Sequence, residues 1–132
     1  MMVRLYTGED GQSHLEDMTL SWGRDHRGRE QTPMRGATGL EFARLPGGYA
    51  SKWHTASRHA YAIILAGQME CTIGDGTVRR LGPGDILLAE DFTGQGHCNR
   101  VLDDQSLVVA FVRIDGHVEL DADRREERRD KV

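Results

Sequence analysis

Short strand-forming segments fill the chain from residue 39 to residue 114, and a turn rich in glycine, proline or aspartate separates each from the next. No helical pattern interrupts them. Short strands at this spacing are typical of an all-β sandwich or barrel. The expected strands are Gly39 to Leu45, Tyr49 to His54, Ala60 to Ala66, Gln68 to Ile73, Thr77 to Leu81, Ile86 to Glu90, His97 to Leu102 and Ser106 to Ile114.

The residues before this region have weaker patterns. Met1 to Thr7 alternates weakly and predicts an edge strand, and Gly8 to Ser13 is typical of a turn. Met18, Leu20 and Trp22 alternate with polar residues, which predicts a half-buried strand.

Gly23 to Gly39 is rich in glycine and has no apolar periodicity, which predicts an irregular, solvated N-terminal arm. The alternative is a lid that places basic side chains against an anionic ligand. These side chains are Arg24, His26, Arg27 and Arg29. At the other end, Asp121 to Lys131 is almost entirely charged and predicts a solvated tail.

The overall composition excludes several classes of protein. A chain of 132 residues is long enough for one domain and one core. The net charge of -4 is small and dispersed, which argues against nucleic-acid binding. No apolar run is long enough to span a membrane and no signal peptide opens the chain, so we expect a cytoplasmic protein in which Cys71 and Cys98 are reduced.

A polar stretch with two histidines and an arginine leads directly into an apolar run between Gly48 and Gly67. Ala60 to Ala66 is too short for a buried helix and ends at Gly67, so it predicts a strand with both faces covered. Loop residues before such a strand lie at the rim of a barrel and point toward a cavity. We therefore expect the functional site at this junction.

Two motifs with characteristic spacing frame this region. Gly48 is followed after five residues by His54, and Gly67 ends the first motif. The second motif is Pro83-Gly84-Asp85, a strand, and then His97 with Asn99 shortly after. The segment from Gly48 to Asn99 thereby resembles the two sequence motifs of the cupin superfamily, which are double-stranded β-helix (jelly-roll) barrels. The resemblance implies one cupin domain in residues 1–132, with a barrel core at about 39–115.

In cupins, two histidines and a glutamate of the first motif and the later histidine bind a divalent metal. His54 and His97 occupy two of these positions, whereas Ala56 and Ala60 fall on the second histidine and the glutamate. The resemblance thus implies a degenerate metal motif. Either no cofactor is required, or His54 and His97 hold one Fe, Mn, Ni or Zn ion with a carboxylate from the neighbouring loop.

Where ligand side chains have become methyl groups, the barrel has room for an organic molecule. A pocket with a few titratable groups then suits acid–base chemistry. The candidate catalytic residues are His54, His97, Tyr61 and Asp91. The candidate substrate-binding residues are Trp53, Arg58, His59 and Glu90.

Three functions agree with this set of residues. The first is a small-molecule enzyme of isomerase, lyase or cyclase type, the second is a metal-dependent oxygenase, and the third is a non-catalytic barrel that binds a metabolite. We also expect a homodimer, because the resemblance implies a barrel of a kind that commonly pairs through its edge strands and because an unpaired long strand such as Ser106 to Ile114 needs cover.

Overall fold

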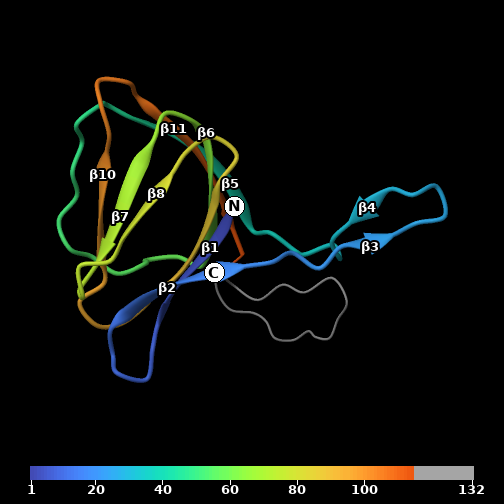
Figure 1. Cartoon of the computed structure of the whole chain (residues 1–132), viewed down its shortest axis with the longest axis horizontal. Helices are drawn as coiled ribbons and strands as arrows, with labels where there is room; N and C mark the ends of the chain where they lie inside the picture. Colours follow the sequence, from blue (N-terminus) through green and yellow to red (C-terminus); the bar gives the residue numbers. More distant parts are fainter. Residues whose placement is uncertain (115–132) are drawn as a thin grey trace.

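Two β-sheets face each other in the computed structural model, which describes residues 1–114 (Figure 1). The larger sheet has six strands in the order β2-β1-β9-β6-β11-β5, and the smaller has three in the order β10-β7-β8. The strands of the larger sheet are β1 (Met2–Thr7), β2 (Ser13–Met18), β5 (Gly39–Leu45), β6 (Ala60–Ala66), β9 (Ile86–Glu90) and β11 (Leu107–Arg113). Those of the smaller sheet are β7 (Met69–Ile73), β8 (Val78–Leu81) and β10 (His97–Val101). The predicted charged segment Asp121 to Lys131 lies outside the described residues.

The chain crosses repeatedly from one sheet to the other. From β5 onward the strands of the larger sheet alternate with segments of the smaller one, as β9, β10 and β11 do. No helix occurs among residues 1–114. This arrangement confirms the predicted all-β jelly-roll barrel.

Most strand predictions after residue 39 are confirmed. β5, β6 and β9 have the predicted bounds, and β7, β8, β10 and β11 begin or end one residue away. The exception is Tyr49 to His54, which makes isolated bridges from Ala50 to Arg100 and from His54 to His97 beside β10. Gly67 closes β6 as expected: its φ is 79°, and a Cβ there would lie 2.4 Å from the carbonyl oxygen of Ser106.

The predictions for the first twenty residues are partly wrong. β1 is not an edge strand, because it pairs with β2 on one side and runs parallel to β9 on the other. Its side chains Val3 and Leu5 are fully buried. The second strand covers Ser13–Met18, so Leu20 and Trp22 lie beyond it, and Trp22 is 57% exposed. The parallel pairing joins segments more than eighty residues apart, which no local pattern reveals.

One of the two reasons for the homodimer prediction is wrong. β11 is paired along its length on both sides, with β5 and with β6, so it needs no partner from another chain. The edge strands of the larger sheet are β2 and β5.

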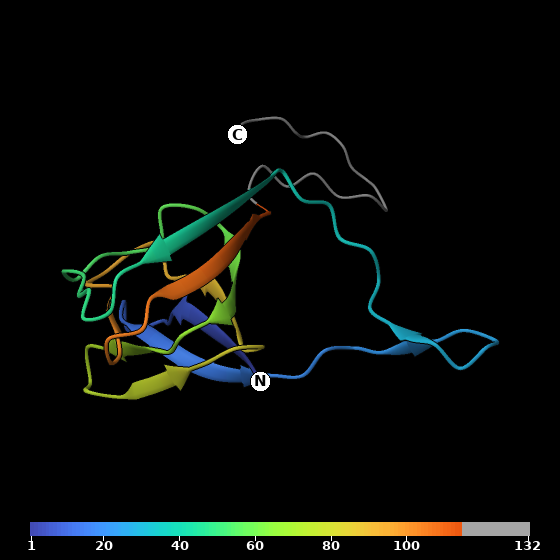
Figure 2. The ribbon, with the colours of Figure 1, turned by 90° about the horizontal axis from the view of Figure 1, so that it is seen from above.

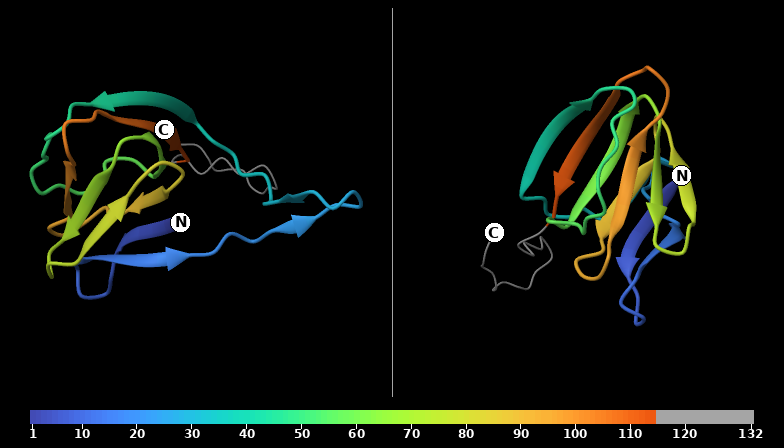
Figure 3. Two further views of the ribbon diagram at one scale, coloured as in Figure 1. Left: turned by 45° about the horizontal axis from the view of Figure 1, so that its top comes forward. Right: turned by 90° about the vertical axis from the view of Figure 1, so that its left-hand side faces the viewer.

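The arm before β5 projects from the barrel (Figures 2 and 3). It contains a small two-stranded hairpin, β3 (Gly23–Arg24) and β4 (Glu30–Gln31). It extends away from the barrel, and none of its residues lines the internal cavity. The lid hypothesis is therefore wrong for this structure.

The hydrophobic core fills the space between the sheets. Its fully buried side chains include Val3, Leu5, Ile64, Leu81, Val101 and Leu107. A second cluster lies on the outer face of the larger sheet, where Leu20 and Tyr61 pack against Met2, Leu88 and Ile114. Within the described part of the chain there is no helix of the length and apolarity needed to span a bilayer.

Candidate functional site

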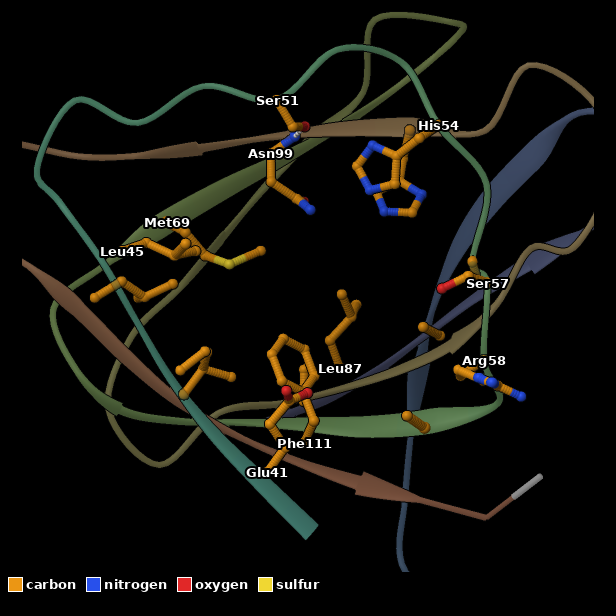
Figure 4. Close-up of a pocket in the computed structure, with 18 of the residues that line it drawn as sticks. Glu41, Leu45, Ser51, His54, Ser57, Arg58, Met69, Leu87, Asn99 and Phe111 are labelled. Carbon is orange, nitrogen blue, oxygen red and sulfur yellow. Dashed lines mark hydrogen bonds between the residues drawn. The ribbon is translucent and has the colours of Figure 1, made fainter. Parts of the chain in front are cut away.

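A cavity of about 380 Å³ lies between the sheets and opens beside the loop that joins β5 to β6 (Figure 4). This volume is near the lower end of the range for small-molecule sites. Apolar side chains from both sheets form the wall, among them Ala43, Ala62, Met69, Leu87, Val109 and Phe111. Polar groups interrupt this wall: Figure 4 shows His54, Ser57 and Arg58 on the loop and Glu41 at another side of the cavity.

The backbone holds His54 and His97 side by side. The amide N–H of His54 donates to the carbonyl oxygen of His97 over 2.9 Å, and the amide N–H of His97 donates to the carbonyl oxygen of His54 over 2.8 Å. Gly96 makes this approach possible: its φ is 82°, and a Cβ there would lie 2.0 Å from the carbonyl oxygen of His54. As a result the two imidazole rings have centroids 4.4 Å apart, and both line the cavity.

A buried carboxylate fixes the ring of His97. Nδ1 of His97 lies 2.7 Å from Oδ2 of Asp91, a residue that is 0% exposed. The hydroxyl of Ser13 donates to the same oxygen over 2.7 Å. Because a carboxylate accepts, Nδ1 carries the proton of this bond, and Nε2 is the nitrogen left for a molecule in the cavity.

His54 has a similar arrangement with a weaker partner. Its Nδ1 lies 2.8 Å from the carbonyl oxygen of Lys52, which can only accept a hydrogen bond. Nδ1 of His54 is therefore the protonated nitrogen as well, and Nε2 is available as an acceptor. Unlike His97, which is 4% exposed, His54 is exposed to solvent.

Asn99 adds an amide to the same wall. The hydroxyl of Ser51 accepts its backbone N–H over 2.9 Å, and Figure 4 shows both residues beside the cavity. The side-chain Oδ1 of Asn99 is buried and has no hydrogen-bond partner among the described residues. A buried acceptor without a partner costs free energy.

The residues around the two histidines do not fit a metal ion. Ala56 and Ala60 line the cavity at two of the four positions that bind metal in cupins. Among residues 1–114 no group of three or more histidine, cysteine, aspartate and glutamate side chains could hold an ion. Glu90 does not move in as a ligand, and Asp91 holds Nδ1 of His97 and the hydroxyl of Ser13 through Oδ2, while its Oδ1 is buried without a hydrogen-bond partner among the described residues. Two imidazoles alone fall short of the three or four protein ligands that a transition metal usually takes.

The structure brings some of the predicted site residues to the cavity and places the others elsewhere. His54, Arg58 and His97 line the cavity, and Asp91 supports His97 from behind. Tyr61 does not line it, since the strand alternation that turns Ala60 and Ala62 inward turns Tyr61 to the outer face. The outer face of β6 is only partly covered, since Leu65 on that face is 49% exposed. Trp53 is 43% exposed and lines no part of the cavity.

The remaining two, His59 and Glu90, form an ion-pair network away from the cavity. Nε2 of His59 lies 2.6 Å from Oε2 of Glu90, and Nε of Arg4 donates to Oε1 of Glu90 over 2.5 Å. Burial alone would raise the pKa of the Glu90 carboxyl, but the hydrogen bonds from Arg4 and His59 outweigh it and hold the pKa below its ordinary value. Both carboxylate oxygens of Glu90 are engaged in this network. Neither His59 nor Glu90 lines the cavity, so the structure does not bring them together with His54 and His97.

Three further residues at the site were not predicted from the sequence. Ser13 supports Asp91 from a strand 78 residues away in the sequence, and no local signal links the two. Glu41 and Arg113, 4.0 Å apart on β5 and β11, also line the cavity. Their signal was available in the alternation of β5 and β11, which places both on the inner face.

Comparisons with known proteins find distant similarity to solved structures. A scan against models of protein families and a search of curated proteins both find no match. A solved cupin protein from Bacteroides fragilis is 19% identical over 87% of this chain and 98% of its own, with a TM-score of 0.45. The cupin domain of Schizosaccharomyces pombe Cnp3 is 15% identical over 73% of this chain and 79% of its own, with a TM-score of 0.45. A conserved protein of unknown function from Streptococcus pyogenes is 20% identical over 63% of this chain and 68% of its own, with a TM-score of 0.44.

The fold and the cavity define a small cupin-like jelly-roll barrel with an internal site, as the sequence motifs implied. The similarity to the solved structures is too distant to carry a function from them to this chain.

Proposed function

We propose that this barrel is a small-molecule enzyme in which His97 is the general acid–base, of the isomerase, lyase or cyclase type. The observation that carries the proposal is the buried pair of Asp91 and His97 at the wall of an apolar cavity. A carboxylate that holds Nδ1–H of an imidazole fixes both its orientation and its tautomer, so that Nε2 can accept a proton from a bound molecule.

The reaction classes share a first step that this geometry suits. Nε2 of His97 takes a proton from a carbon next to a carbonyl group; the electron pair of the broken C–H bond forms a C=C bond, and the π pair of the C=O bond moves to the carbonyl oxygen to give an enolate. In a hydroxy ketone, return of the proton to the former carbonyl carbon, with the hydroxyl proton passed to the other oxygen, isomerises the substrate. In a substrate with a leaving group on the β-carbon, return of the oxygen electron pair re-forms the carbonyl and expels that group in an elimination. His54, whose ring is in contact with that of His97, is placed to exchange protons with solvent because it is exposed.

The lining of the cavity supports one class of substrate. The wall favours a compact molecule with an apolar body. The Asn99 amide, which lines the cavity, favours a substrate with a hydroxyl group. A hydroxy ketone or hydroxy acid with a short hydrocarbon chain combines these features with an acidic C–H bond.

The test is solvent deuterium exchange, which detects proton transfer without knowledge of the product. The protein is incubated in D₂O with acetoin, 2-hydroxycyclohexanone and 3-hydroxy-2-oxo acids of increasing chain length, and loss of the C–H signal is followed by NMR. We expect the wild type to exchange at least one probe, and His97→Gln to be slower by at least about 100-fold. Arg24→Gln, on the projecting arm, is the matched surface control and is expected to equal the wild type.

Two results would overturn this function. One is equal exchange by the wild type and by folded His97→Gln, and the other is no exchange of any probe by the wild type. A metal-dependent reaction would instead need exchange that rises with added Fe²⁺, Mn²⁺, Ni²⁺ or Zn²⁺ and falls with a chelator, a result against which the two-imidazole site argues.

Asn99 is tested separately as the group that orients the substrate. Asn99→Leu removes the side-chain amide at similar volume, so an apolar isostere of the best probe, with methyl in place of hydroxyl, should bind better to the variant than to the wild type. The measurement is the Kd of both probes by NMR titration. An unchanged ratio of the two Kd values would show that Asn99 does not contact the hydroxyl group.

A further inference from the structure

Two arginines, Arg58 and Arg113, line the cavity beside Ala60. Arg113 is the last residue of β11 and lies opposite Ala60 in the antiparallel register of β11 and β6. This register continues one residue further, because the amide N–H of Ile114 donates to the carbonyl oxygen of His59 over 2.8 Å. Arg58 is then the diagonal neighbour of Arg113, and such neighbours lie about 7–8 Å apart, within the reach of long side chains. Both guanidinium groups can therefore contact the same small group in the cavity.

Small residues flank Arg113 on both neighbouring strands. Its partner on β5 is Gly39, where a Cβ would lie 3.7 Å from Cδ of Arg113, and its partner on β6 is Ala60. Ala60 also falls on the position of the metal-binding glutamate of cupins. Where a cupin metal site has an acid, this chain thus has a methyl group and, opposite it, a cation. A cation at this position repels a metal ion and attracts an anion.

The permanent charges around the cavity have a positive sum. Among the described residues that line it, Glu41 is the one acid, against Arg58 and Arg113. Oε1 of Glu41 lies 4.0 Å from a terminal nitrogen of Arg113, which is beyond hydrogen-bond distance, and the Glu41 side chain is 62% exposed. An exposed pair of this length contributes little, so Glu41 does not saturate the five N–H donors of the guanidinium group.

We propose that Arg58 and Arg113 form a carboxylate subsite, so that the substrate is a short-chain hydroxy acid or hydroxy oxo acid and not a neutral hydroxy ketone. This inference rests on the proposed function for the reaction, but the subsite is a binding property that is measured without turnover. The planar fork of a guanidinium group matches the two oxygens of a carboxylate. One negative charge also balances two arginines and one glutamate, whereas a phosphate group carries nearly two charges at pH 7.

The test compares the binding of an acid with that of its amide, which has nearly the same shape without the charge. The probes are lactate, 2-hydroxybutanoate and 2-hydroxy-3-methylbutanoate with the three matching carboxamides, and each Kd is measured by NMR titration of the full chain. We expect the wild type to bind the best acid at least about tenfold more tightly than its amide. Arg58→Gln and Arg113→Gln should each reduce this preference to about threefold or less. Arg113→Lys should retain part of it, because the charge remains while the fork is lost.

Two further variants separate the subsite from a general effect of charge. Arg44→Gln is the matched control: Ala43 and Leu45 line the cavity, so Arg44 between them lies on the outer face of β5, where it is exposed. It removes the same charge and should leave the preference for the acid unchanged. Glu41→Gln should change the preference in the opposite direction, with the acid bound about two- to fivefold more tightly than by the wild type.

The possible results decide between this inference and its alternatives. Equal binding of acid and amide by the wild type overturns the subsite, as does binding of no probe, or a preference that survives in either glutamine variant. If Arg113→Gln fails to fold, Arg58→Gln decides, since Arg58 lies on the loop before β6. A preference for the acid without deuterium exchange of any probe would overturn the proposed function and leave the subsite in place. Exchange of acetoin together with equal binding of acid and amide would do the reverse.

Discussion

Glu90 and Asp91 are neighbours in the sequence, and each holds a histidine, but they do so on opposite sides of the larger sheet. Asp91 is 0% exposed and binds His97 at the wall of the cavity. Glu90 binds His59 together with Arg4 away from the cavity. The first pair leaves a ring nitrogen for a ligand, whereas the second is closed by a cation that engages the other carboxylate oxygen.

The difference shows what turns a carboxylate–histidine pair into a candidate catalytic group. The two pairs have similar lengths, 2.7 Å for Asp91 with His97 and 2.6 Å for Glu90 with His59. What separates them is the side of the sheet, which alternates from one residue to the next, and the presence of a third charged partner. Contacts of similar length therefore lie in unlike surroundings, one pair at the wall of the cavity and the other in an ion-pair network away from it.

The largest expected effect comes from removing the charge of each carboxylate in turn. Asp91→Asn removes the anion that fixes Nδ1–H of His97, so exchange of the best deuterium probe should fall by at least about 100-fold. Glu90→Gln is the matched control one residue away and should stay within about twofold of the wild type. The ¹⁵N shifts of His97 should show the Nδ1–H tautomer in the wild type and a mixture of tautomers in Asp91→Asn. Equal losses in the two variants would erase the distinction between the pairs.

The next effect is on stability, to which we expect Glu90 with His59 to contribute more than Asp91 with His97. The pKa of Glu90 lies below its ordinary value of 4.5 because the hydrogen bonds from Arg4 and His59 outweigh the opposing effect of burial. A depressed pKa stabilises the folded state above pH 4.5, and this stability is lost as the pH falls through the folded pKa. Between pH 7 and pH 3 the wild type should therefore lose about 1–2 kcal/mol more free energy of unfolding than Glu90→Gln, measured by urea denaturation.

Glu16→Gln provides the control for this pH dependence. Glu16 lies 3.6 Å from the same Arg4, but its side chain is 56% exposed, so its contribution should be close to zero. If Glu90→Gln follows the same pH curve as the wild type, the network around Arg4 does not stabilise the fold.

The sequence predicts the residues that line the cavity better than the residues that hold them in place. The spacing of Gly48, His54 and Gly67 and the later His97 was enough to place both histidines at one cavity, and Ala60 and Ala62 were expected on the inner face. The same alternation excludes Tyr61 from that face. Motif spacing and strand period are local properties, so a single sequence contains them.

The residues that hold the histidines in place come together only through pairings between distant segments. Glu90 and Asp91 look equivalent in the sequence, and their roles separate only when β9 pairs with β1 and brings Arg4 to one of them. Ser13 reaches Asp91 only because β2 lies next to β1. The arm was predicted as an exposed loop, and no local pattern encodes the direction in which it projects.

The smallest expected effect tests one of these distant supports. The hydroxyl of Ser13, which is 3% exposed, donates to the carboxylate oxygen that also holds His97. Ser13→Ala removes one of two donors to that oxygen, a loss of about 1 kcal/mol in positioning, so exchange should slow by about three- to tenfold. Since Ser13 acts through Asp91 and touches no ligand, the loss should appear in kcat with KM unchanged, and Ser13→Thr should restore the rate. A loss as large as that of Asp91→Asn would show that the hydroxyl, and not the carboxylate, sets the orientation of His97. No loss at all would show that the buried carboxylate holds the ring without help.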